Sequence, residues 1–507
     1  MDDGATLGVR GRLIALALGP AVAGIAWLSL GGAGLTPEGR WVCALAVLMA
    51  AWWMTEALPL AATSLLPLAV LPLAGVMPGD RAAAPYADKI VFLFMGGFML
   101  QQAMQKWNLH QRIALWTLLA VGTRPRRLIL GVMAATATLS MWVSNTACAA
   151  MMLPIGVSIC QLLMSRAGEE TEPGRLPRDR QIRNFAVCMM LAIASSATIG
   201  GLATPVGTPP NLLGVAYLRD KLGVEVTFLG WMAVCVPVSA VLLLAAWVLL
   251  TRVVFPVRLE SLPGGREFIR RELHALGPMR LGEGLVMGVF ACTALCWIFR
   301  QPLCDALGLY AVSASGKREY TVLEDHTIAI VAALVLFALP TDLRRGEFVL
   351  DWKHASRLPL GVLLLFGGGL SLAAAFSATG VDRSIGQALA GLGGLPPWLV
   401  VVIATAAAVF LSEFVSNTAL VATFLPIVHG AAGAMGLDPA VLLLPLALGA
   451  STAFMLPAGT PPNAIVFSSG YLTVAQMARF GVLMNLLSIA LVSAALWWCS
   501  WVIVGVR

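Results

Sequence analysis

Long apolar stretches dominate the pattern of hydrophobic and polar positions along the chain. Runs of mostly apolar residues recur from Gly11 to Trp501, and many are about 18 to 22 residues long, enough to cross a hydrocarbon layer as a helix. Counting these runs gives about eleven crossings and two further segments that enter and return. Backbone groups in lipid must bond within helices or closed barrels. The pattern therefore predicts an all-α polytopic membrane protein.

One polar triplet interrupts the apolar pattern twice. Ser-Asn-Thr occurs in SMWVSNTACAAMMLPI (140–155) and in SEFVSNTALVATFLPI (412–427), with ten of sixteen positions identical at an offset of 272 residues. Polar side chains in lipid are costly unless something pairs with them. Helix capping would satisfy some of them, but a duplication that preserves the neighbouring residues favours two halves of one ligand site.

A second pair of interruptions is rich in proline. Two apolar runs, 185–217 and 441–468, each contain Gly-Thr-Pro-Pro-Asn, at 207–211 and 459–463. Proline cannot continue a helix, so each run should form a crossing that is broken inside the membrane. A kink would need only one proline, and paired broken helices are typical of the binding sites of secondary transporters.

The distribution of charge predicts how the chain is threaded. With the N-terminus in the cytoplasm, cytoplasmic segments contain 23 of the 33 Lys and Arg residues, as the positive-inside rule requires. The first hairpin then opens to the cytoplasm and the second to the outside, so the halves are inverted repeats. The C-terminus is expected outside. The protein is expected in a cell membrane, such as the bacterial inner membrane. The net charge of +7 needs no nucleic-acid partner.

These expectations divide the chain into four parts. They are an N-terminal span (1–40), a first inverted repeat (41–255) with a hairpin (124–166) and a broken helix (184–218), a cytoplasmic amphipathic linker (256–282), and a second inverted repeat (283–507) with a hairpin (397–432) and a broken helix (439–470).

The chemistry of the four motifs suits an anion bound together with a cation. Freed backbone carbonyls can coordinate a hard cation, while helix N-termini and hydroxyls can face an anion. The motifs contain no lysine or arginine, so an anion there would need a co-bound cation. Two equivalent sets of donors suit a ligand with two similar anionic ends, such as a dicarboxylate. The chain has no H-E-x-x-H or G-x-S-x-G motif, and we do not expect an enzyme.

The combination of motifs resembles the divalent anion/sodium symporter family. The resemblance includes WMTEALPLAATSLLPL (53–68), the paired triplets and the paired breaks, and it extends from about Trp41 to the C-terminus. It implies transport of dicarboxylates, citrate or sulfate by a homodimer in lipid, with a scaffold domain and a transport domain that moves like an elevator. Threonine as the third residue of both triplets is similar to members that prefer C4 dicarboxylates such as succinate, malate and fumarate. Sodium-independent exchange stays open.

Matching motifs imply particular site residues. The first sodium site would use Ser140, Ser144, Asn145 and Gly207, and the second Ser412, Val415, Asn417 and Gly459. The substrate residues would be Asn145, Thr146, Thr208, Ser416, Asn417, Thr418, Thr460 and Pro461. Two sodium ions only neutralise a dianion, so an inward current would require a third. Glu413 is an acid within a membrane segment, but Met141 takes its place in the first half, so we expect a structural or indirect role.

Overall fold

The computed structural model describes most of the chain. The described residues are 9–32, 35–122, 124–166, 179–259, 265–312, 318–319, 322–381, 384 and 395–504. The first eight residues of the expected N-terminal span, residues 260–264 of the expected linker and the last three residues lie outside this part.

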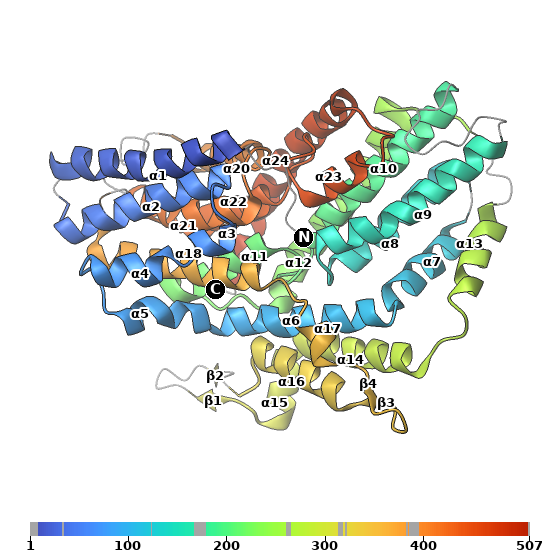
Figure 1. Ribbon diagram of the computed structural model, residues 1–507, viewed down its shortest axis with the longest axis horizontal. Coiled ribbons are helices and arrows are strands. Elements are labelled where there is room, and N and C mark those ends of the chain that lie inside the picture. Colours follow the sequence, from blue (N-terminus) through green and yellow to red (C-terminus); the bar gives the residue numbers. More distant parts are fainter. Residues whose placement is uncertain are drawn as a thin grey trace.

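Helices make up nearly all of the described structure (Figure 1). The first half contains α1 (Val9–Ser29), α2 (Pro37–Thr55), α3 (Leu60–Thr63), α4 (Leu66–Leu73), α5 (Gly79–Ala83), α6 (Lys89–Lys106), α7 (Leu109–Val121), α8 (Pro125–Ser140), α9 (Asn145–Arg166), α10 (Arg180–Leu202), α11 (Pro209–Leu222), α12 (Phe228–Val248) and α13 (Gly265–Ala275). Short 3₁₀ turns (Leu30–Gly32 and Ala84–Ala87) and a π-helical segment (Leu249–Val254) adjoin these helices.

The second half continues in the same manner. Its helices are α14 (Leu281–Ile298), α15 (Arg300–Leu307), α16 (Asp325–Ala338), α17 (Trp352–Ala355), α18 (Leu360–Thr379), α20 (Pro397–Leu411), α21 (Asn417–Ala434), α22 (Ala440–Ala450), α23 (Pro461–Phe467) and α24 (Val474–Val504). Two small antiparallel ribbons lie in connecting segments and pair β1 (Ala311–Val312) with β2 (Arg318–Glu319), and β3 (Pro340–Asp342) with β4 (Glu347–Phe348).

The expected all-α polytopic fold is confirmed. Within the described residues, eight helical stretches are long and apolar enough to cross a membrane, from Arg10–Ser29 to Val474–Ser500. By its apolar residues alone, the run from Ala61 to Val76 is expected to form a single crossing, but it is divided into α3 and α4. Pro67 has no N–H to donate to the carbonyl of Thr63, which weakens a continuous helix there and favours the break.

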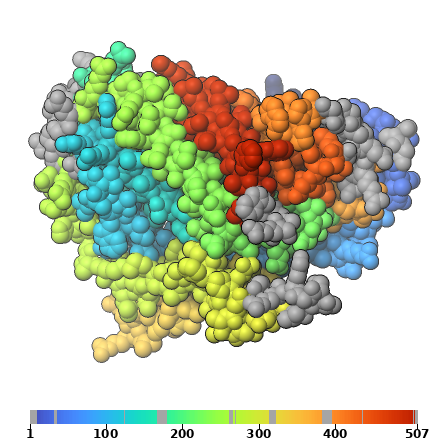
Figure 2. All heavy atoms as spheres, turned by 180° about the vertical axis from the view of Figure 1, so that it is seen from behind, coloured from blue at the N-terminus to red at the C-terminus, as the bar shows by residue number. Residues whose placement is uncertain are grey.

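Helix α10 lies at the centre of the packing. Every residue from Phe185 to Pro205 is buried, because α10 packs against α8, α9, α12 and α23. A helix that is covered on all sides can be apolar on all sides, which explains the absence of a polar face. Figure 1 shows α8, α9 and α10 side by side, and Figure 2 shows α24 (red) running beside α12 (green).

The matching Phe-x-Gly-Gly segments of α6 and α18 lie close to each other. The rings of Phe94 and Phe366, which are related by the offset of 272 residues, have centroids 4.5 Å apart. A Cβ on Gly96 would lie 2.7 Å from the backbone of Ala329, and one on Gly368 would overlap the carbonyl of Ser64. These glycines allow close helix packing.

A buried ion pair joins α7 to α14. The Arg112 guanidinium donates to Glu283 at 2.5 Å and to the carbonyl of Gly277 at 3.1 Å, and the ion-paired side chains are each only 6% exposed. Removing one partner of such a pair leaves an uncompensated charge.

We expect Arg112→Met to lower the free energy of unfolding by about 3–5 kcal/mol, because Glu283 would remain buried without its cation. The measurement is the thermal unfolding midpoint in detergent. Arg345→Met is the control, since Arg345 is 76% exposed beside Asp342 and an exposed pair contributes about 1 kcal/mol or less. Equal midpoints for the two variants would contradict the assignment.

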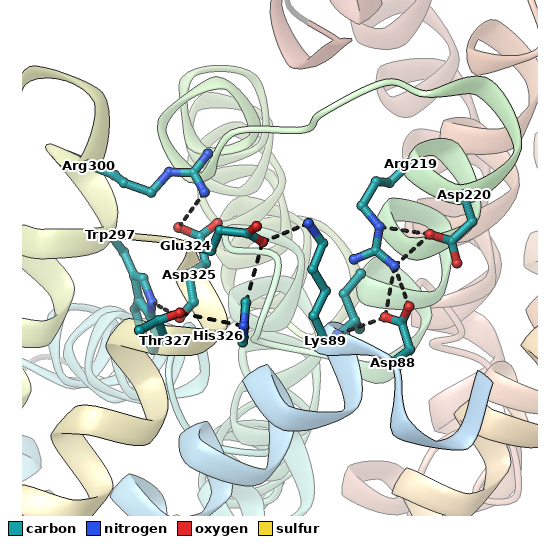
Figure 3. A network of polar contacts seen from close by, with 11 residues as sticks. Asp88, Lys89, Arg219, Asp220, Trp297, Arg300, Glu324, Asp325, His326 and Thr327 are labelled. Carbon is teal, nitrogen blue, oxygen red and sulfur yellow. Dashed lines mark hydrogen bonds and ion pairs between the residues drawn. The ribbon is translucent and has the colours of Figure 1, made fainter. Parts of the chain in front are cut away.

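A second polar network joins four other helices (Figure 3). Ion pairs connect Arg219 of α11 with Asp88 before α6 at 2.7 Å, and Lys89 with Glu324 before α16 at 2.6 Å. Arg300 of α15 lies 3.5 Å from Asp325. The network borders an open pocket. These ion pairs bring together segments that are up to 235 residues apart in the sequence, as Lys89 and Glu324 are.

Candidate functional site

The first triplet lies where α8 ends and α9 begins. The Ser140 hydroxyl, in the last residue of α8, lies 2.8 Å from Oδ1 of Asn145 and 2.7 Å from the carbonyl oxygen of Ala197 in α10. Gln101 of α6 donates through Nε2 to the Ser144 hydroxyl at 3.1 Å. The triplet is therefore held by polar side chains of α8 and α6, and Ser140 in turn bonds α10.

The first break lies between α10 and α11. Asn211 spans it by donating through Nδ2 to the carbonyls of Gly201 and Thr204, each at 3.0 Å. A Cβ on Gly201 would overlap the Asn145 amide, and one on Gly207 would lie 2.5 Å from the carbonyl oxygen of Gly201. Asn145 and Gly207, two predicted ligands of the first sodium site, are thus both packed against Gly201.

The second triplet and second break repeat this arrangement. The triplet lies between α20 and α21, and the break between α22 and α23. Asn463 donates through Nδ2 to the carbonyls of Leu456 at 3.0 Å and Ala453 at 3.4 Å, as Asn211 does in the first half. A Cβ on Gly459 would lie 2.5 Å from Glu413 Oε2. Ser412 differs from Ser140, the matching residue of the first half. The Ser412 hydroxyl donates to the carbonyl of Val409, three residues earlier in the chain, at 2.8 Å.

Helices that begin at the motifs of one half pack against helices that begin at the motifs of the other half. Helix α9, which begins in the first triplet, packs against α23, which begins after the second break. Reciprocally, α21 begins in the second triplet and packs against α11, which begins after the first break. Each triplet helix therefore contacts the break helix of the other half. This reciprocal contact is what a local twofold relation between the halves requires.

Three buried oxygens at these motifs have no hydrogen-bond partner within the described part of the chain. They are Oδ1 of Asn417, Oγ1 of Thr460 and Oδ1 of Asn211. An unsatisfied buried polar atom costs about 1–3 kcal/mol, and such atoms often indicate a missing ligand. Amide, hydroxyl and carbonyl oxygens are the ligands that hard cations take.

The burial of the predicted site residues varies with their position. Ser140, Ser412, Gly207, Thr208, Gly459 and Thr460 are buried; Ser144, Asn145, Val415, Ser416, Asn417 and Thr418 are half-buried; Thr146 and Pro461 are exposed. Every predicted residue lies at a hairpin tip or at a break. The spread from buried to exposed fits a site in which cations lie deeper than the transported solute.

Sequence analysis missed several polar residues around the site. Gln101 is 7% exposed in α6, and Asn485 is fully buried in α24. A polar side chain inside an apolar membrane run is itself a signal of a buried partner, and both residues could have been selected on that basis. Asn211 and Asn463 were part of the recognised motifs, but their role in spanning each break was not predicted.

Broken membrane helices that meet inside a helical bundle define the class of the protein. Such helices supply the binding sites of secondary transporters, and the fold and the site together are those of a polytopic membrane transporter. Residues 11–504 match the family model described as the sodium:sulfate symporter transmembrane region. The chain therefore belongs to the divalent anion/sodium symporter family and is a transporter, not an enzyme.

Individual relatives agree with this assignment. The sodium-dependent dicarboxylate transporter SdcS of Staphylococcus saprophyticus is 38% identical over 483 residues, covering 95% of this chain and 90% of the relative. SdcS of Staphylococcus aureus strain USA300 is 38% identical over 497 residues, covering 98% and 92%.

Two solved transporters share the fold. The YdaH transporter of Alcanivorax borkumensis has a TM-score of 0.56 at 14% identity, covering 91% of this chain and 99% of the other. MtrF of Neisseria gonorrhoeae has a TM-score of 0.55 at 13% identity, covering 99% and 96%.

Proposed function

We propose that the protein is a sodium-coupled symporter of small divalent anions, with C4 dicarboxylates such as succinate, malate and fumarate as substrates. The observation that carries the proposal is that three buried oxygens at the triplets and breaks, Asn417 Oδ1, Thr460 Oγ1 and Asn211 Oδ1, have no hydrogen-bond partner within the described residues. Relatives that are 38% identical are named sodium-dependent dicarboxylate transporters, which supports this choice of ion and solute.

The proposal assigns the predicted residues to ligands. The sodium ions bind at Ser140, Ser144, Asn145 and Gly207 in the first half and at Ser412, Val415, Asn417 and Gly459 in the second. The carboxylates of the substrate bind at Asn145, Thr146, Thr208, Ser416, Asn417, Thr418, Thr460 and Pro461. Sodium is cargo here, moving with the solute.

Charge balance explains why sodium and substrate bind together. The four motifs contain no lysine or arginine, so neutral donors and helix N-termini alone would face a dianion. Two sodium ions neutralise two carboxylates and lower the cost of burying them. A third cation would make each cycle carry one net charge, worth about 2.3 kcal/mol per 100 mV.

Polar contacts between distant segments support the proposed threading. Asp88, Arg219, Arg300 and Glu324, which belong to the network of Figure 3, all fall in segments that the charge distribution places outside. On the opposite face, Arg112 contacts Gly277 and Glu283, and Arg126 donates to the carbonyl of Val257 at 2.7 Å. These segments were all placed inside. We therefore retain a cytoplasmic N-terminus, an extracytoplasmic C-terminus and inverted repeats.

The remaining parts of the proposal concern motion and assembly. We retain the repeats at 41–255 and 283–507, separated by the linker at 256–282, and we propose that the loaded transport domain crosses as a unit against a dimeric scaffold. The interlaced contacts of α9 with α23 and of α11 with α21 support this, because a site built from both halves can move without being taken apart.

Uptake by proteoliposomes tests the proposed function. With an inward sodium gradient, labelled succinate should accumulate, and replacing sodium by potassium should reduce uptake to background. Unlabelled succinate, malate and fumarate should compete more strongly than sulfate or citrate. Rapid succinate counterflow in sodium-free vesicles would instead identify a sodium-independent exchanger.

A further inference from the structure

Glu413 occupies a position that no predicted ligand set uses. It lies between Ser412 and Val415, at the tip of the hairpin between α20 and α21, and only 1% of the residue is exposed. We propose that Glu413 is a positioning residue for the second sodium site: it fixes the second break, and through it Gly459, without itself binding sodium. This inference rests on the proposed function of the same site.

The Glu413 carboxylate holds the break through three successive backbone groups. Its Oε1 accepts from the N–H of Phe454 at 2.8 Å and of Met455 at 2.9 Å. Its Oε2 accepts from the N–H of Leu456 at 3.0 Å. These N–H groups follow the end of α22 at Ala450, so they lack helical partners. One side chain therefore sets the conformation of the segment that leads to Gly459.

Asn485 extends the same arrangement to α24. Its Nδ2 donates to Glu413 Oε1 at 2.8 Å, and its Oδ1 accepts from the N–H of Phe454 at 3.2 Å. The carboxylate thus joins the hairpin tip, the break and α24. Four donors to one buried carboxylate offset the cost of placing an acid within the membrane.

Direct contact with Gly459 connects this arrangement to the proposed sodium site. A Cβ added to Gly459 would lie 2.5 Å from Oε2 of Glu413. Only glycine therefore allows the carboxylate to come this close to the backbone. Both carboxylate oxygens are already engaged by donors. Their hydrogen bonds therefore act on the break and on α24.

The first half joins its hairpin segment to its break through neutral groups. At the position that matches Glu413 it has Met141, whose backbone carbonyl accepts from the Thr204 hydroxyl of the first break. A carboxylate therefore holds the break in the second half, whereas a neutral backbone carbonyl takes its place in the first half. Changing Glu413 should disturb the second sodium site and leave the first one intact.

Sodium titration of Glu413→Gln tests the inference. Glutamine keeps the size but places an amide NH₂ against one of the donors. Changes to the partners that orient metal ligands typically reduce metal affinity about 10- to 100-fold. We expect the sodium concentration for half-maximal succinate uptake to rise at least about 10-fold. The KM for succinate, measured at saturating sodium, should stay within about threefold of the wild-type value.

Glu283→Gln is the matched control, because Glu283 is an equally buried carboxylate whose partner is Arg112. It should lower the unfolding midpoint without changing the sodium response. A Glu413→Gln protein with a lower midpoint but wild-type sodium dependence would overturn the inference. If Glu413→Gln does not fold, Asn485→Ala removes one of the four donors and should shift the sodium response in the same direction; an unchanged response would again overturn the inference.

The wild-type protein in the same assay separates the two proposals. A wild type without sodium dependence would overturn the proposed function. A sodium-dependent wild type with an unaffected Glu413→Gln variant would overturn only the role of Glu413.

Discussion

Asn417→Ala is expected to abolish sodium-dependent succinate uptake. Asn417 begins α21, and its Oδ1 is buried without a partner in the described part of the chain. The proposal uses this side chain for both sodium and substrate, so alanine would remove a ligand of each. A decrease of kcat/KM of at least about 100-fold corresponds to about 2.7 kcal/mol. Asn145→Ala should have the same effect, because Asn145 takes the matching position in the first half.

The measurement is initial uptake by proteoliposomes with equal amounts of folded protein, checked by gel filtration. Thr423→Val is the control on the same helix: the Thr423 hydroxyl bonds the carbonyl of Ala419 at 2.9 Å and has no role in the site. Its uptake should stay near the wild-type value. Normal transport by Asn417→Ala would remove this residue from the site.

Gly201→Ala should also abolish uptake, although it removes no polar group. The added methyl would overlap the Asn145 amide, and Asn145 cannot retreat freely because its Oδ1 contacts the Ser140 hydroxyl at 2.8 Å. Displacing Asn145 would disturb the first sodium site and one substrate ligand. We therefore expect a loss similar to that of Asn145→Ala.

Gly97→Ala is the matched control, because a Cβ there would have nothing within 4 Å and alanine is the better helix former by about 1 kcal/mol. Uptake is measured as before, together with the unfolding midpoint. Gly97→Ala should keep full uptake. Full uptake by Gly201→Ala would mean that Asn145 can move without consequence, which would weaken its assignment as a ligand.

Local physics made the fold and the outline of the site predictable from sequence. An apolar run longer than the hydrocarbon layer has few alternatives to a crossing helix, and clustered prolines must interrupt a helix. The duplication then located both triplets and both breaks, which lie where one helix ends and the next begins. The division of the run from Ala61 to Val76 was not predicted. The sequence alone does not distinguish a proline in the first turn of a new helix, such as Pro67, from a proline inside a continuous helix.

The remaining features depend on contacts between residues that are far apart in sequence. Gln101 reaches Ser144 across 43 positions, and Glu413 reaches Asn485 across 72. The pairing of α9 with α23 and of α11 with α21 has no local signature at all. The motifs can be identified in the sequence, whereas the partner of each motif depends on the three-dimensional packing.

Helix α11 has a further consequence for experiments. It begins beside Thr208 of the candidate site, and it bears Arg219, which is paired with Asp88 in the polar network of Figure 3, beside a pocket. Eleven residues of α-helix span about 16 Å. Helix α11 therefore connects the proposed substrate residue Thr208 with the open pocket beside Arg219. An environment-sensitive dye on a cysteine at Glu225, which borders that pocket, would report solute arrival optically from a position too remote to touch the solute.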